Sequence, residues 1–149
     1  MRGSVPRVPS DTALKVMNTL HRGVLRLSFG KVGWDLKMPV LELTTTGRKT
    51  GLPRRTMLTS PAREGDAIVV VASRGGDDTH PAWYLNLLAN PEVEVVYRGE
   101  PRRRMRARVA TPDERARLWP AIAAGPGPYD RYQHKTEREI PLVLLDPPA

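Results

Sequence analysis

The chain has 149 residues, a length that fits one domain with a single hydrophobic core. Lys and Arg number 24 against 16 Asp and Glu, so the formal net charge is +8 and the overall field attracts anions such as phosphates, acidic tails, anionic lipids and nucleic acids. Cysteine is absent, which excludes disulfides, thiolate metal sites and a thiol nucleophile, so redox chemistry would require a bound cofactor.

Residues 1–38 are predicted to form an amphipathic helix and a connector. Ser10 can cap a helix in which apolar residues recur at three- and four-residue spacing, namely Leu14, Met17, Leu20, Val24 and Leu27. Two interpretations stay open, because such a helix packs on its own domain or lies with its basic residues on an anionic membrane. The start has no signal-peptide pattern and residues 67–72 are too short to span a bilayer, so we expect a cytoplasmic protein, with peripheral membrane contact through this helix as an alternative.

Six segments have the patterns of β-strands. Residues 39–46 alternate in polarity and are joined to a partner over 54–60 by the turn GRKTG, which predicts a hairpin. The run AIVVVA at 67–72 is apolar on both faces, so it belongs in the middle of a sheet. Further strands are predicted over 92–98, 103–110 and 140–145.

Three short helices separate these strands. His80 and Pro81 open the first, with proline at the first helical position and Asn90 closing it. A capping box at 111–114 starts the second, which ends near residue 125, and the third covers 129–138. Strands dominate, so we predict a mainly β (α+β) fold, a six-stranded antiparallel barrel over 39–149 with short covering helices, in one structural domain overall.

The turn at 47–51 is the first candidate binding segment. Its glycines allow close backbone approach, and Arg48, Lys49 and the Thr50 hydroxyl can bind an anion, with Arg54 and Arg55 a few residues away. It does not match the GxxxxGK[ST] phosphate-binding loop. A phosphate site and a solvated basic hairpin turn are both compatible with this segment.

The second candidate is the end of the apolar strand, residues 71–76. Glycines at a strand end let a flat ligand lie against the backbone, although a simple Gly-Gly turn has the same sequence. A hydrolytic triad of Ser73, His80 and Asp77 or Asp78 is disfavoured because no GxSxG motif surrounds the serine.

The third candidate is the helix that begins near Pro81. Trp83 and Leu87 share one face and Tyr84 and Leu88 the next, which is typical of core packing, while Tyr84 or Asn86 can present a polar group to a ligand. The three histidines of the chain do not have the spacing of metal ligands, so no metal site is predicted.

Taken together, three segments resemble the deazaflavin-dependent nitroreductase family of actinobacteria. They are LTTTGRKTGLPRRTML, VVVASRGGDDTHPAWYLNLLANPEVEV and GPYDRYQHKTEREIPLVLL, in the same order and spacing over residues 39–146. The resemblance implies a split β-barrel and coenzyme F-420, an 8-hydroxy-5-deazaflavin with a phosphodiester and an oligoglutamate tail. It implies an oxidoreductase that passes a hydride from the reduced cofactor to an electron-poor organic acceptor such as a quinone or a nitroaromatic compound.

The resemblance also implies roles for individual residues. It places Tyr129 and Tyr132 over the acceptor as catalytic residues. The cofactor-binding residues that it implies are Arg48, Lys49, Thr50, Arg54, Arg55, Met57, Val71, Ala72, Ser73, Arg74, Gly75, Gly76, Ala82, Trp83, Tyr84 and Asn86.

Two alternatives remain at the level of sequence. A barrel of this kind can bind FMN or haem instead. The net charge and the arginine-rich strand at 102–108 also fit a non-enzymatic binder of nucleic acid or of a membrane surface. No helix-turn-helix or aromatic RNA-binding platform is evident, so we expect a small-molecule acceptor and no specific nucleic acid as partner. The sequence does not predict an oligomeric state.

Overall fold

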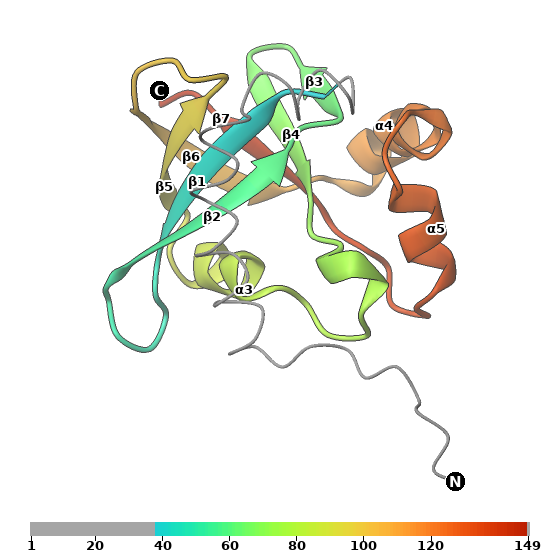
Figure 1. Ribbon diagram of the computed structural model, residues 1–149, viewed down its shortest axis with the longest axis horizontal. Helices are drawn as coiled ribbons and strands as arrows, with labels where there is room; N and C mark the ends of the chain where they lie inside the picture. Colours follow the sequence, from blue (N-terminus) through green and yellow to red (C-terminus); the bar gives the residue numbers. More distant parts are fainter. Residues whose placement is uncertain (1–37, 149) are drawn as a thin grey trace, which may run out of the picture.

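The computed structural model describes residues 38–148, which form one curled antiparallel β-sheet with four helical segments (Figure 1). The predicted N-terminal helix lies outside the described residues. The strands are β1 (Val40–Thr46), β2 (Pro53–Thr59), β3 (Ala62–Glu64), β4 (Ala67–Val71), β5 (Glu92–Tyr97), β6 (Arg103–Val109) and β7 (Leu142–Asp146). Their order is β2-β1-β5-β6-β7-β4-β3, so β2 and β3 are the two edges of the sheet.

The mainly β, antiparallel fold predicted from the sequence is confirmed, with one strand more than expected. All six predicted strands are present within one or two residues of their predicted bounds. The seventh, β3, has three residues and pairs only with β4, so it was too short to show an alternating pattern.

Both faces of the sheet are buried at β4, and every residue of this strand is apolar. Ile68 and Val70 pack into the core inside the curled sheet, while Ala67, Val69 and Val71 face a second core. Burial of all five residues confirms that this strand lies within the sheet.

Helix α3 (Ala82–Ala89) closes one end of the curled sheet (Figure 1). Pro81 is its N-cap, with an extended backbone, so the prediction that proline takes the first helical position is wrong by one residue. Trp83, Tyr84 and Leu87 are buried as predicted, but Leu88 is 52% exposed. A surface helix buries only the face that it turns towards the core. In this eight-residue helix Tyr84 lies on the buried face and Leu88 does not.

Helices α4 (Pro112–Ala124) and α5 (Tyr129–His134) lie beside each other and cover the second core (Figure 1). The predicted capping box is confirmed, since the Glu114 amide donates to the Thr111 hydroxyl at 3.2 Å and the Thr111 amide to the Glu114 carboxylate at 2.9 Å. The third helix ends at His134 rather than at residue 138, and Thr136 and Arg138 instead bond to the segment that follows β4. No helix in residues 38–148 combines the length and apolar character needed to cross a bilayer.

Candidate functional site

The turn between β1 and β2 is held in a defined shape by its own backbone. The Gly47 amide donates to the Leu52 carbonyl and the Gly51 amide to the Gly47 carbonyl, each at 2.8 Å. Gly51 has a φ of +72°, a conformation that side chains disfavour. The Thr50 hydroxyl accepts from the Leu52 amide at 3.2 Å and from the Arg54 guanidinium at 3.3 Å. These bonds order the turn without any contribution from the side chain of Lys49.

Asn86 ties this turn to α3. Its side-chain oxygen accepts from both the backbone amide and the guanidinium of Arg48, at 3.1 and 3.0 Å, and its amide nitrogen donates to the Thr45 hydroxyl at 3.2 Å. Asn86 is only 4% exposed, so these bonds satisfy a buried amide. The structure thus gives Asn86 a role in holding the turn, and the predicted contact of Asn86 with a cofactor stays a prediction.

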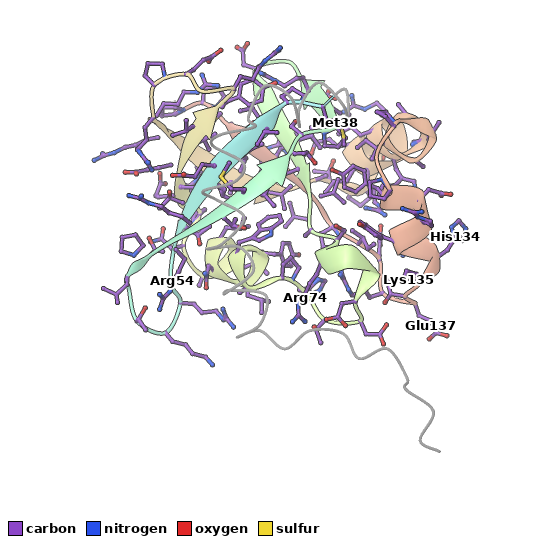
Figure 2. The ribbon with its side chains drawn as sticks, in the orientation of Figure 1. Met38, Arg54, Arg74, His134, Lys135 and Glu137 are labelled. Atoms are coloured by element: carbon purple, nitrogen blue, oxygen red, sulfur yellow. The ribbon has the colours of Figure 1, made fainter. Side chains whose placement is uncertain are left out.

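The cations of the turn are exposed, and the described part of the chain gives three of them no acidic partner. Within residues 38–148, none of Arg48, Lys49 and Arg54 forms an ion pair, whereas Arg55 lies 3.9 Å from the buried Glu42 carboxylate. Arg54 and Arg74 both lie along the lower side of the molecule in Figure 2, Arg54 beside the hairpin turn and Arg74 in the segment after β4. Uncompensated positive charge next to ordered backbone is the property expected of a site for a phosphate or carboxylate ligand.

One face of β2 connects this turn with α5. This face carries every second residue of the strand, namely Arg55, Met57 and Thr59. Leu58 lies on the other face and packs against the inner core. Thr59 lies four residues beyond Arg55 along the strand, a distance of roughly 13 Å. At the far end the Thr59 and Tyr129 hydroxyls share a hydrogen bond of 2.8 Å. The edge strand therefore joins the cationic turn at one end to the tyrosine helix at the other.

The segment after β4 forms a tight turn, the 3-10 helix η1 (Arg74–Gly76). Its three residues all have positive φ, +45°, +65° and +84° in order, which is unfavourable for Arg74. The Arg74 guanidinium contacts Asp77 and Thr79 within the same loop. A Cβ on Gly76 would lie 2.8 Å from the Tyr132 carbonyl oxygen, so glycine allows η1 to pack directly against α5.

The two predicted catalytic tyrosines have different surroundings. Tyr129 is 6% exposed, its ring packs in the second core, and burial raises the pKa of its hydroxyl, which is bonded to Thr59. Tyr132 is half-buried with its ring edge-on to Tyr129 at 6.5 Å. Its hydroxyl forms no hydrogen bond within residues 38–148. Of the two, only Tyr132 has a hydroxyl available to a ligand.

The remaining predicted residues are buried or partly exposed. Val71, Ala72, Trp83 and Tyr84 have buried side chains in the two cores, while Ser73 and Ala82 are partly exposed. The His80 ring lies 4.7 Å from the Tyr84 ring. Burial lowers the pKa of His80, and the nearby Arg138 guanidinium lowers it further.

The structure thus brings the predicted residues into two linked groups. The turn and Asn86 form one group, and η1, the start of α3 and α5 form the other. Two residues that sequence reasoning missed complete these links, Thr59 and Arg138. Thr59 is the last residue of β2, whereas Arg138 lies in the connector between α5 and β7, and no local pattern in the sequence marks either residue. No cluster of three or more metal-ligating side chains occurs in the described part of the chain.

Comparison with known proteins adds independent information. Residues 18–147 match the model of a family described as F420H(2)-dependent quinone reductase. An F420H(2)-dependent quinone reductase of Mycobacterium tuberculosis is 43% identical over 131 residues, which cover 85% of this chain and 87% of that protein.

Solved structures agree with this match. The structure of an F420-H2 dependent reductase is 38% identical with a TM-score of 0.63, covering 72% of this chain and 94% of the other. A second solved structure, a domain-swapped dimer, has the same identity and TM-score and covers 72% of this chain and 80% of the other. At this identity and coverage the similarity is one of sequence as well as of fold.

Proposed function

Because this chain belongs to the F420H(2)-dependent quinone reductase family, we propose that it transfers a hydride from reduced coenzyme F-420 to a quinone. The deazaflavin family resemblance inferred from three sequence motifs is confirmed, and so is the assignment as an oxidoreductase. When bound, the reduced cofactor supplies a hydride from its C5 carbon, so no protein nucleophile is needed. The absence of cysteine in the chain is consistent with this chemistry.

The observation that carries the proposal for this site is the cationic turn. Arg48, Lys49 and Arg54 have no carboxylate partner among the described residues, and they surround an ordered backbone turn with a hydroxyl at Thr50. A phosphodiester and an oligoglutamate tail are the type of ligand that such a donor set binds. We assign the phosphate of coenzyme F-420 to this turn and its acidic tail to the exposed cations around it.

The deazaflavin would lie between the turn and α5. The face of β2 that carries Met57 leads from the cations towards Tyr129, and the partly exposed Ser73 begins the η1 turn that packs against α5. Backbone groups of η1 can bond to the polar edge of a flat ring, as glycines at a strand end allow. The buried side chains of Trp83 and Tyr84 support this region from within the core.

Tyr132 is the residue that we assign to the acceptor. Reduction of a quinone to a hydroquinone adds one hydride and one proton, and negative charge develops on the quinone oxygen as the hydride arrives. A hydroxyl that donates to this oxygen stabilises the charge. The Tyr132 hydroxyl is available for this bond, whereas Tyr129 holds the helix against β2 through Thr59.

The proposal is tested by titrating the purified protein with oxidised coenzyme F-420 and following the fluorescence of the cofactor. Steady-state oxidation of the reduced cofactor with menadione then measures turnover, with a nitroimidazole as a second acceptor. We expect saturable binding, much weaker binding of FMN, and turnover of the quinone. FMN binding equal to or tighter than that of coenzyme F-420 would overturn the proposal.

A further inference from the structure

Proline interrupts the ladder between β4 and β7 at the point where β4 ends. The two strands pair with Val71 opposite Leu142, which places Ala72 opposite Pro141. The Ala72 amide donates to the Pro141 carbonyl at 3.0 Å. In an antiparallel pair of this type the amide of the partner residue would donate to the Ala72 carbonyl, but proline has no amide hydrogen. The Ala72 carbonyl therefore needs a donor from elsewhere.

Arg138 supplies that donor and reaches further along the same loop. Both terminal nitrogens of its guanidinium donate to the Ala72 carbonyl at 3.3 Å, and Nη2 also donates to the Ser73 carbonyl at 2.9 Å. Its Nε donates to the Asp77 carbonyl at 2.7 Å. One planar cation thus binds the backbone immediately before and immediately after η1.

The loop that Arg138 holds has an unfavourable backbone. All three residues of η1 have positive φ, although Arg74 is not glycine. Such a conformation persists only where surrounding contacts enforce it. The Arg138 bonds at both ends of η1, together with the Thr136 hydroxyl that donates to Asp78 at 2.8 Å, are contacts of this kind.

We propose that Arg138 is a positioning residue, which holds the Ser73–Gly76 backbone in the shape that binds the deazaflavin. This inference rests on the proposed function, since it concerns the same cofactor. Arg138 binds the backbone of the loop and acts through it. Its bonds join the connector that follows α5 to the loop after β4.

The same guanidinium fixes the state of His80. Arg138 Nη1 donates to His80 Nδ1 at 3.1 Å, so Nδ1 must be unprotonated and the ring hydrogen lies on Nε2. Asp77 and Asp78 also lie near Arg138, and Tyr84 packs against the imidazole. The protonation of His80 therefore reports whether the Arg138 contact is intact, independently of catalysis.

A matched control exists in Arg115. Its guanidinium is also half-buried, donates to the Ile140 carbonyl and pairs with Glu139 at 2.5 Å, so it holds the same connector between α5 and β7. It makes no bond to residues 72–77. Arg138→Gln and Arg115→Gln each remove one cation and carbonyl-binding contacts, but only the first affects the loop. Arg138→Lys keeps the charge without the planar set of donors.

The experiment compares the full-length variants by thermal melting, by fluorescence titration with oxidised coenzyme F-420 well below the melting temperature, and by NMR titration of His80. We expect Arg138→Gln to weaken cofactor binding by about tenfold, because the binding-competent shape of the loop would then be populated only part of the time, and Arg138→Lys to weaken it less. Arg115→Gln should lower the melting temperature and leave cofactor affinity within about twofold of wild type. The pKa of His80 should rise in Arg138→Gln only.

Several results would overturn the inference. One is an Arg138→Gln variant that melts at the same temperature as Arg115→Gln and binds the cofactor like wild type. If Arg138→Gln does not fold, wild-type affinity in Arg138→Lys would overturn it as well. Failure of the wild-type protein itself to bind coenzyme F-420 would instead overturn the proposed function, and the role of Arg138 with it.

Discussion

Two regions of the molecule are rich in basic residues but differ in their electrostatic surroundings. In the turn between β1 and β2, Arg48, Lys49 and Arg54 have no acidic partner within the described residues. In and beside β6, by contrast, three of five arginines are paired with carboxylates. These pairs are Arg102 with Glu42 and Glu94, Arg106 with Glu92, and Arg108 with Glu114 and Asp146.

This difference shows that net charge alone does not locate an anion site. Antiparallel pairing places β5, which carries Glu92 and Glu94, beside β6, so most of the arginine charge there is compensated. The turn projects beyond the neighbouring strands (Figure 1), since β5 pairs with β1 only over residues 41–44 and β2 is an edge of the sheet. Positive charge that the fold leaves uncompensated is the better guide to ligand binding, and it argues against the arginine strand as a nucleic-acid surface.

The largest expected effect separates these two regions directly. Replacing Arg48 and Lys49 together by alanine should weaken binding of coenzyme F-420 by about a hundredfold or more, because each charge-assisted bond contributes roughly 1.5–3 kcal/mol. Replacing Arg103 and Arg104 by alanine removes the same amount of charge from β6. That control should change affinity by no more than about twofold at physiological ionic strength. Equal losses in the two double variants would show that only the overall field attracts the cofactor.

The second prediction concerns the end of the site opposite the turn. Tyr132→Phe should reduce quinone turnover by up to about a hundredfold, since it removes a donor to the developing negative charge. Cofactor affinity should stay near that of wild type, because the cations of the turn are untouched. Steady-state rates and fluorescence titration measure the two quantities separately.

Tyr129→Phe is the matched comparison for that variant. Its hydroxyl is bonded to Thr59 in a buried position, so its loss should lower the melting temperature more than the rate. Wild-type turnover in Tyr132→Phe, together with a lowered melting temperature, would assign both tyrosines to packing.

The third prediction concerns a variant in which a carboxylate compensates the positive charge of the turn, as carboxylates do in β6. Asn86→Asp keeps the acceptor for both Arg48 nitrogens, so the turn stays anchored, but it adds a negative charge in a buried position. Cofactor affinity should fall by about tenfold through repulsion of the phosphodiester. Thermal melting should show a folded protein, since the Thr45 hydroxyl can donate to the new carboxylate. Undiminished affinity in this variant would show that the phosphate does not bind near Asn86.

Much of the fold followed from local patterns in the sequence. The apolar run of β4 and the capping box at Thr111 each depend on a few neighbouring residues, and both were predicted correctly. The strand β3 and the exposure of Leu88 were missed, because they depend on what the rest of the chain places beside them.

The candidate site was predicted less completely, for the same reason. Motif spacing identified the turn and the tyrosine segment, but the bonds from Arg48 to Asn86 and from Arg138 to Ser73 join residues 38 and 65 positions apart. No local pattern announces such contacts. The assignments of individual cofactor residues stay predictions, as do the cytoplasmic location and the membrane contact proposed for residues 10–27.

The smallest expected effect tests whether the compensated arginines serve stability alone. Arg108 pairs with Glu114 at 2.6 Å and with Asp146 at 2.6 Å. The hydrogen bond from Arg108, followed by that from the Thr111 backbone, lowers the pKa of Glu114 from 4.5 to about 2. Glu114→Gln removes the charge but keeps an acceptor for the Thr111 amide, so the capping box survives.

The pH dependence gives this variant a specific signature. A carboxyl with a lower pKa in the folded state stabilises the fold above its unfolded pKa, so the contribution is complete above about pH 4.5 and is lost as the pH falls through about 2. Since the Arg108 side chain is 42% exposed, solvent screening limits that contribution to about 1 kcal/mol or less. Denaturant unfolding at pH 7 should therefore show Glu114→Gln less stable than wild type by up to about 1 kcal/mol. That difference should shrink progressively between pH 4.5 and 2. Affinity for coenzyme F-420 should not change, and a loss of affinity comparable to that of the turn variants would mean that the arginines of β6 also bind the cofactor.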